Sequence, residues 1–241
     1  MRDTLVVIPT YNEIENIEAI IRATFAVSSF VEILIVDDNS PDNTAQKVMS
    51  LQKSYPGRLF LENRKAKEGL GTAYIYGFRW ALERKYNYIC EMDADFSHNP
   101  KDLIVLHESC HENGVDLSIG SRYKSGVNVV NWPMNRVLLS YFASKYVQVI
   151  TRMQINDATA GFICYKRKVL ESINFDKIQF IGYAFQIEMK FKAYLKGFKI
   201  EEVPVIFTDR TKGVSKMDRS IISEAVFGVI LMKIKSFFIK Q

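Results

Sequence analysis

The 241-residue sequence contains few cysteines, and the three that it has, Cys90, Cys110 and Cys164, lie far apart. An odd number of widely spaced cysteines provides neither a disulfide framework nor a thiolate metal site, and it fits a reducing compartment. The sequence also lacks a Ser-, Gly- or Pro-rich linker, an internal repeat and a low-complexity segment. Because 48% of the residues are hydrophobic, we expect one domain with a packed core.

Long hydrophobic runs are absent as well. The longest apolar stretch, residues 225–232, is far shorter than the roughly 18 residues that a membrane-spanning helix needs. Residues 1–9 are too short for a signal peptide, and we expect them to form the first strand. The sequence therefore predicts that the chain is not an integral membrane protein.

Charge of either sign is moderate. Lysine and arginine number 32 against 27 acidic residues, a net charge of +5, and the excess is concentrated after residue 165. Such a bias suits phosphate-bearing substrates or an anionic lipid surface. It is too small to indicate nucleic acid as a partner, and the sequence has no aromatic-basic motif of an RNA-binding module.

Strand and helix patterns alternate along residues 5–121. Ser40 and Pro41 look like the N-cap and the first residue of the second helix. Alternation of this kind predicts an α/β fold, with a mostly parallel central sheet flanked by helices and all strand ends at one edge. The predicted strands are 5–8, 32–36, 58–62, 88–92 and 116–121, and the predicted helices are 15–25, 42–54, 70–84 and 101–112.

After residue 122 the alternation is less regular. The predicted helices there are 134–150, 184–195 and 220–238, and the predicted strands are 161–166 and 200–207. The last helix is apolar around much of its circumference and carries interspersed lysines. It either covers the sheet or lies on an anionic bilayer, and the sequence leaves both open.

Two carboxylates, Asp93 and Asp95, directly follow the predicted strand 88–92. Ligands of open α/β sheets bind at the carboxyl ends of strands. Paired carboxylates suit Mg²⁺ or Mn²⁺, which often holds a substrate diphosphate. Taken alone, the pair could also be a solvated turn.

Three other predicted strand ends carry polar clusters. They are the segments 9–13 (PTYNE), 37–40 (DDNS) and 120–123 (GSRY). Helix capping explains one such cluster more readily than four on one edge. The convergence predicts a nucleotide-diphosphate site.

With segments 69–73 (GLGTA) and 92–95 (MDAD), these clusters resemble the inverting family 2 glycosyltransferases of the Rossmann-like GT-A fold. A closer resemblance, to dolichyl-phosphate (polyprenyl-phosphate) mannosyltransferases, rests on four further segments. They are 131–133 (NWP), 157–162 (DATAGF), 182–188 (GYAFQIE) and 207–210 (FTDR). The resemblance covers almost the whole chain. It implies a single GT-A domain with a nucleotide-sugar-binding half (1–122), an acceptor-side half (123–219) and a C-terminal helix (220–241), for which binding at a membrane interface is left open.

The resemblance also implies roles for individual residues. Asp37 would read the base, and Asp95 would ligate the metal with Asp93 beside it. Ser97 stands where the family often has glutamine, so a shorter hydroxyl, or a water in its place, would complete the ligands. The implied nucleotide-sugar site comprises Pro9, Tyr11, Glu13, Asp37, Asp93, Asp95 and Arg122.

Arg122, Arg210 and Lys216 would bind the diphosphate or the acceptor phosphate, and with Asp95 they form the implied catalytic set. An acceptor that is already a phosphate monoester is largely ionised near neutral pH. It needs cations more than a general base. The base is therefore unassigned, with Asp157 and Glu188 as the carboxylates to test first.

The implied reaction is inverting, metal-dependent transfer of mannose from GDP-mannose to a polyprenyl phosphate such as dolichyl phosphate. It would occur on the cytoplasmic face of a membrane, and a need for small membrane-anchoring subunits is left open. One alternative is transfer of glucose or another sugar from a UDP-sugar to the same lipid. Two others are a zinc hydrolase using His107 and His111 of an HExxH pattern, and a catalytically silent nucleotide-binding protein.

Overall fold

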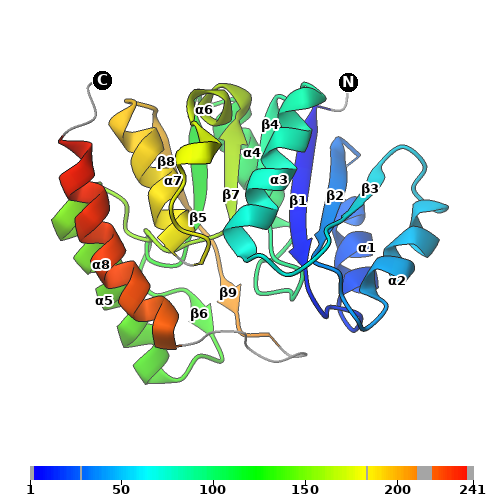
Figure 1. The fold of residues 1–241 in the computed structure, drawn as a ribbon, viewed down its shortest axis with the longest axis horizontal. Coiled ribbons are helices and arrows are strands. Elements are labelled where there is room, and N and C mark those ends of the chain that lie inside the picture. Colours follow the sequence, from blue (N-terminus) through cyan, green and yellow to red (C-terminus); the bar gives the residue numbers. More distant parts are fainter. Residues whose placement is uncertain (1–2, 28, 183, 211–218, 238–241) are drawn as a thin grey trace.

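The computed structural model describes residues 3–27, 29–182, 184–210 and 219–237. Its centre is a seven-stranded sheet in the order β3-β2-β1-β4-β7-β5-β8 (Figure 1). The strands are β1 (Thr4–Thr10), β2 (Val31–Asp37), β3 (Leu59–Asn63), β4 (Tyr88–Glu91), β5 (Leu117–Ser121), β7 (Ile163–Lys166) and β8 (Ile200–Pro204). Two short strands, β6 (Val129–Val130) and β9 (Phe207–Thr208), form a separate parallel pair.

Helices cover both faces of the sheet. They are α1 (Ile17–Val27), α2 (Thr44–Gln52), α3 (Leu70–Glu83), α4 (Asp102–His111), α5 (Met134–Thr151), α6 (Arg167–Ser172), α7 (Ala184–Leu195) and α8 (Arg219–Ser236), with a 3₁₀ turn at Phe175–Lys177. Helices α5 and α8 lie side by side at one end of the molecule (Figure 1).

Alternation along the strands divides the core in two. In β1, Leu5 and Val7 pack with α3, α6 and α7, whereas Val6 and Ile8 pack with α1, α2 and α4. Successive side chains of a strand point to opposite faces, so a strand that is apolar throughout needs cover on both sides. The predicted α/β architecture is confirmed.

Only β7 runs against the other strands of the sheet, between β4 and β5. The remaining pairings, β1 with β2 and β4, β2 with β3, and β5 with β8, are parallel. All strands except β7 therefore end at the same edge, the lower edge in Figure 1. The predicted convergence of strand ends is confirmed.

Two local predictions were wrong. Helix α2 begins at Thr44 after Asn43, whose φ is 68°, so Ser40 is not its N-cap. Ser40 instead donates from its N and Oγ to Asp37. The predicted strand 200–207 is broken after Pro204, because the chain leaves β5 and re-pairs at Phe207 with Val129.

Among the described residues, no helix is both long and apolar enough to cross a membrane. The prediction of a last helix is confirmed within the described part, over Arg219–Ser236, while residue 238 lies outside it.

The contact between α3 and β1 gives a test of the packing. A Cβ built on Gly77 would come within 2.4 Å of Val7 Cγ1, and neither the helix backbone nor the buried strand can easily move aside. We expect Gly77→Ala to lower the free energy of unfolding by about 1–3 kcal/mol. Urea unfolding measures this, with Glu83→Ala at the exposed end of α3 as the control, expected within about 0.5 kcal/mol of the unsubstituted chain. Equal stability of Gly77→Ala would contradict the close packing.

Candidate active site

The ends of β1 and β2 are joined by the side chain of Asp37. Its carboxylate is fully buried and accepts hydrogen bonds from Thr10 Oγ1 (2.8 Å), Ser40 N (2.8 Å) and Ser40 Oγ (2.6 Å). Ser40 Oγ in turn accepts from Asn12 N at 3.0 Å. Asp37 thus fixes the loop after β1, and its predicted contact with a base stays a prediction.

The other predicted nucleotide residues lie on the same loop. Pro9, Tyr11 and Glu13 are half-buried at the carboxyl end of β1. Lys67 Nζ lies 4.6 Å from the centre of the Tyr11 ring, and Glu13 accepts from Asn16 Nδ2 at 3.0 Å.

Asp93 and Asp95 follow β4 and have different surroundings. Burial, with the neighbouring charge of Asp95, raises the pKa of Asp93 to about 7. Burial would also raise the pKa of Asp95, but hydrogen bonding by Ser97 and the charge of Arg210 lower it. Asp95 Oδ1 accepts from Ser97 N at 3.0 Å, and Arg210 Nη2 lies 3.0 Å from Asp95 Oδ2.

The donor set here fits a hard divalent cation. Asp93, Asp95 and Ser97 all line one cavity, and Ser97 Oγ is buried without a hydrogen-bond partner among the described residues. Carboxylate and hydroxyl oxygens are suitable ligands for Mg²⁺ or Mn²⁺, which usually keep positions for substrate phosphate oxygens. Three oxygen-bearing residues would therefore leave room for a diphosphate.

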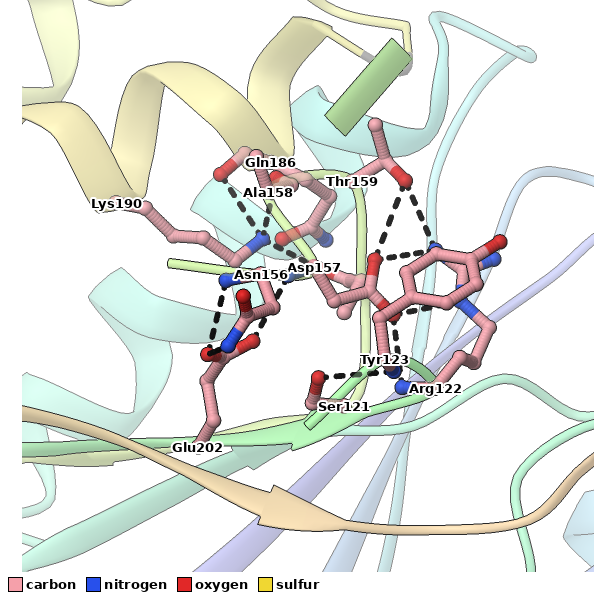
Figure 2. A network of polar contacts seen from close by, with 11 residues as sticks. Ser121, Arg122, Tyr123, Asn156, Asp157, Ala158, Thr159, Gln186, Lys190 and Glu202 are labelled. Carbon is pink, nitrogen blue, oxygen red and sulfur yellow. Dashed lines mark hydrogen bonds and ion pairs between the residues drawn. The ribbon is translucent and has the colours of Figure 1, made fainter. Parts of the chain in front are cut away.

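Arg122, directly after β5, is held by Asp157 (Figure 2). Its Nε and Nη2 donate to Asp157 Oδ2 and Oδ1 at 2.7 and 2.6 Å, and its main-chain N donates to Oδ2 at 2.9 Å. Arg122 Nη2 also donates to Thr159 Oγ1 at 2.8 Å. The guanidinium lies in the cavity wall with its orientation fixed by a two-point contact.

Arg210 reaches the site by way of the β6–β9 pair. Thr208 N donates to Ser97 O at 3.4 Å, and Asp209 N donates to Val130 O at 3.0 Å. These contacts place Arg210 against Asp95 although the two are remote in sequence. Lys216, the remaining cation of the predicted set, lies outside the described residues.

One cavity of about 390 Å³ contains these groups. Its polar part is formed by Asp93, Asp95, Ser97, His98, Arg122, Arg136, Asp209 and Arg210. Its apolar part is formed mainly by α5, and the apolar lining residues are Leu139, Phe142, Ala143, Tyr146 and Val147 of α5, Val226 of α8, and Leu70, Trp132, Ile187 and Phe207. Within the described residues, Pro9, Tyr11, Glu13 and Asp37 are not among those that line it. The structure thus joins an ionic site to an apolar wall.

The two carboxylates considered as bases have structural partners. Asp157 is fully buried against Arg122. Glu188 accepts from Gln179 N (2.9 Å) and Phe180 N (3.2 Å). Neither lines the cavity in the described part of the chain.

The histidines of the HExxH pattern lie at the opposite edge of the sheet. His107 stacks on Phe30, with ring centres 4.5 Å apart, and His111 Nδ1 is 3.0 Å from the hydroxyl of Tyr88, the first residue of β4. No group of three or more His, Cys, Asp or Glu side chains in the described ranges is placed to hold a metal ion. The zinc hydrolase alternative therefore lacks a site there.

Sequence reasoning missed several polar residues that line the cavity, among them His98, Arg136 and Gln186. His98 Nδ1 accepts from Asp93 N at 3.1 Å, and burial lowers the pKa of His98 to about 4, so the ring is neutral. Its position inside the Asp-x-Asp loop was a usable signal. No sequence signal pointed to Arg136 in the first turn of α5, because only the fold brings its Nη1 to within 2.8 Å of Asp209 Oδ1.

Comparison with known proteins places the chain among sugar transferases. The family model described as "Glycosyl transferase family 2" matches residues 5–173. The polyprenol monophosphomannose synthase of Mycolicibacterium smegmatis is 45% identical over 94% of this chain and 85% of that protein. The undecaprenyl-phosphate mannosyltransferase of Micrococcus luteus is 40% identical over 93% and 91%.

Among solved structures, the chain is similar to glucosyl-3-phosphoglycerate synthase of Mycobacterium tuberculosis in complex with Mn²⁺, UDP and phosphoglyceric acid. The TM-score is 0.70 at 17% identity, over all of this chain and 80% of that one. At this identity the likeness concerns the fold alone.

The pair of Arg122 and Asp157 gives a test by pH. Burial opposes ionisation of Asp157, but Arg122 lowers its pKa below the usual 3.8. A lowered folded-state pKa stabilises the protein above the unfolded-state value, and this stability is lost as pH falls through the folded-state value. We expect Asp157→Asn to lower the free energy of unfolding by about 3–5 kcal/mol at pH 7, because the buried guanidinium of Arg122 loses the carboxylate charge opposite it. Denaturant unfolding from pH 7 downward should show this cost shrinking only below pH 3.8; a constant cost, or none, would contradict the pairing.

Proposed function

Because the chain belongs to glycosyl transferase family 2, and so is a glycosyltransferase with the predicted GT-A fold, we propose that it transfers mannose from GDP-mannose to a polyprenyl phosphate. The observation that carries this proposal is the single cavity in which carboxylates and arginines adjoin the apolar wall of α5 and α8. A lipid phosphate has the same two parts. The names of the two relatives at 45% and 40% identity, both polyprenyl-phosphate mannosyl enzymes, support the sugar and the acceptor class.

The donor diphosphate would lie beside Asp93 and Asp95. With Ser97, these residues would hold Mg²⁺ or Mn²⁺, which stabilises the negative charge that grows on the departing diphosphate. Arg210, now paired with Asp95, would add a cation on the same side. Pro9, Tyr11, Glu13 and Asp37, at the ends of β1 and β2, would surround the base and ribose, so that residues 1–122 form the nucleotide-sugar half.

The acceptor phosphate would lie beside Arg122. The guanidinium carbons of Arg122 and Arg136 are 5.4 and 4.0 Å from the ring centre of Trp132, which precedes α5. We infer that both arginines would contact the acceptor phosphate, with residues 123–219 as the acceptor half, and that Lys216 would add a third cation. A phosphate monoester is already an anionic nucleophile near neutral pH, because its second pKa is about 6. Direct attack on the anomeric carbon inverts its configuration and needs no base from Asp157 or Glu188.

The acceptor also implies a membrane surface. Helices α5 and α8 expose Leu138, Leu139, Phe142, Phe227, Ile230, Leu231 and Ile234, and Lys233 and Lys235 occupy the last turn of α8. Apolar side chains interspersed with lysines suit the interface of an anionic bilayer. We place the enzyme on the cytoplasmic face of a membrane, alone or with small anchoring subunits.

The reaction is tested by incubating the purified chain with Mn²⁺, polyprenyl phosphate and labelled GDP-mannose, UDP-glucose or UDP-N-acetylglucosamine. We expect label in the lipid phase from GDP-mannose, and loss of transfer on chelation of the metal. Asp95→Asn should lower kcat/KM by about 100-fold or more, as for loss of a well-placed electrostatic group. His107→Ala, remote from the cavity, is the matched control. Transfer from a UDP-sugar alone would contradict the proposal that GDP-mannose is the donor. Transfer by Asp95→Asn at the rate of the unsubstituted chain would contradict the proposed role of Asp95 in the active site.

Membrane binding is tested by sedimentation with vesicles of phosphatidylcholine, with and without phosphatidylglycerol. The double variant Phe142→Ser, Phe227→Ser should bind anionic vesicles at least about tenfold more weakly, because two large apolar side chains, 62% and 73% exposed, are lost from the surface. Met49→Ser on α2 removes an apolar side chain of similar exposure, 51%, and should bind normally. Equal binding by all three chains would contradict this surface.

A further inference from the structure

A buried lysine and a buried glutamate hold the loop 156–160 from opposite sides (Figure 2). Lys190, on α7, is fully buried and its Nζ donates to the main-chain oxygens of Ala158 (3.1 Å) and Ala160 (2.5 Å). Glu202, on β8, accepts from Asn156 N (2.9 Å) and Asp157 N (2.8 Å). Lys190 thus donates to carbonyl groups of the loop, and Glu202 accepts from its amide groups.

Between these two contacts the loop carries Asp157 and Thr159, the side chains that bind Arg122. Neither Lys190 nor Glu202 lines the cavity among the described residues, whereas Arg122 and Thr159 do. The geometry points to Lys190 and Glu202 as positioning residues, which fix Asp157 and Thr159 so that Arg122 presents its guanidinium to the acceptor phosphate. This inference rests on the proposed function for the identity of the acceptor.

The network brings together two carboxylates, Glu202 and Asp157, and two basic side chains, Lys190 and Arg122, all of them nearly or fully buried. The fully buried carboxylate of Glu91 also acts on Lys190. Burial lowers the pKa of Lys190 to about 8, which still leaves the ammonium mostly protonated at neutral pH. A buried ammonium is costly unless its donors are satisfied, and here a third carbonyl, Gln186 O, lies at 3.2 Å. The energetic cost of burying the Lys190 ammonium is consistent with a role in holding the loop 156–160 in one conformation.

The position of the loop determines the orientation of the Arg122 guanidinium in the cavity, because this guanidinium contacts both carboxylate oxygens of Asp157. A planar guanidinium held by both carboxylate oxygens follows any rotation of that carboxylate. Small displacements of a positioned group have large effects on turnover and binding. Loss of Lys190 should therefore act on the phosphate that Arg122 faces and spare the donor.

The experiment compares Lys190→Met, which keeps the length of the side chain, with Lys196→Met at an exposed position just after α7. We expect Lys190→Met to raise the KM for polyprenyl phosphate about tenfold or more, with the KM for the sugar nucleotide changed less than about twofold. Lys196→Met should behave as the unsubstituted chain. Circular dichroism fixes an assay temperature at which all variants are folded.

A double-mutant cycle separates positioning from general damage. In an Arg122→Lys background the two-point contact is already lost, so adding Lys190→Met should change kcat/KM less than about twofold. The same tenfold loss in both backgrounds, or no loss in either, would overturn the inference. If Lys190→Met does not fold, Glu202→Gln releases the loop from its other side and is held to the same outcomes.

Binding of farnesyl phosphate by calorimetry separates this inference from the proposed reaction. Lys190→Met should bind this probe about tenfold more weakly than the unsubstituted chain. Binding without sugar transfer by the unsubstituted chain would count against the proposed function alone. Equal binding by both chains would overturn the inference alone.

Discussion

The buried ion pair of Arg122 and Asp157 connects the two parts of the molecule that the site requires. Arg122 directly follows β5, and Asp157 belongs to the loop that leads from α5 into β7. Asp157 is completely buried, and the three N–H groups of Arg122 that point at it stabilise its charge there. The pair therefore fixes the loop 156–160 against the end of β5, and Arg122 and Thr159, one from each side of this contact, both line the cavity.

How much of the site could be predicted from the sequence depends on how far apart in the sequence the interacting residues lie. The end of a strand can be recognised from neighbouring residues alone, and the parallel arrangement brings Asp37, Asp93 and Arg122 to one edge of the sheet, as predicted. Contacts between remote segments were beyond local patterns. Nothing near Arg210 in the sequence indicates that it pairs with Asp95. Nothing near Asp157, one of the two carboxylates to be tested first as a base, indicates that it pairs with Arg122.

Errors of detail had a similar origin. A serine followed by proline, as at Ser40, is typical of a helix start. Here, however, the hydroxyl and the main-chain amide of Ser40 donate to the buried carboxylate of Asp37, three residues earlier. This contact ties the two loops at the ends of β1 and β2 together, and the helix begins later, at Thr44. A tertiary requirement at the site thus prevailed over a local preference. In the HExxH pattern, a local sequence match did not correspond to a site. Its histidines pack with Phe30 and Tyr88, and no third ligand lies beside them in the described ranges.

The two interpretations of the last helix are compatible. Gly228, Val229 and Met232 form a narrow buried stripe on α8, and a Cβ on Gly228 would come within 2.6 Å of the Phe180 ring. Phe227, 73% exposed, lies outside this stripe, as do the exposed side chains of Ile230, Leu231 and Ile234. A helix that only covered a core would turn most of its apolar side chains inward. Among the described side chains of α8, residues 226–237, this stripe packs inward, while the exposed apolar side chains adjoin the apolar wall of the cavity, which Val226 lines together with Leu139 and Phe142 of α5. Under the proposed function, the long chain of a lipid phosphate would leave the site along this surface.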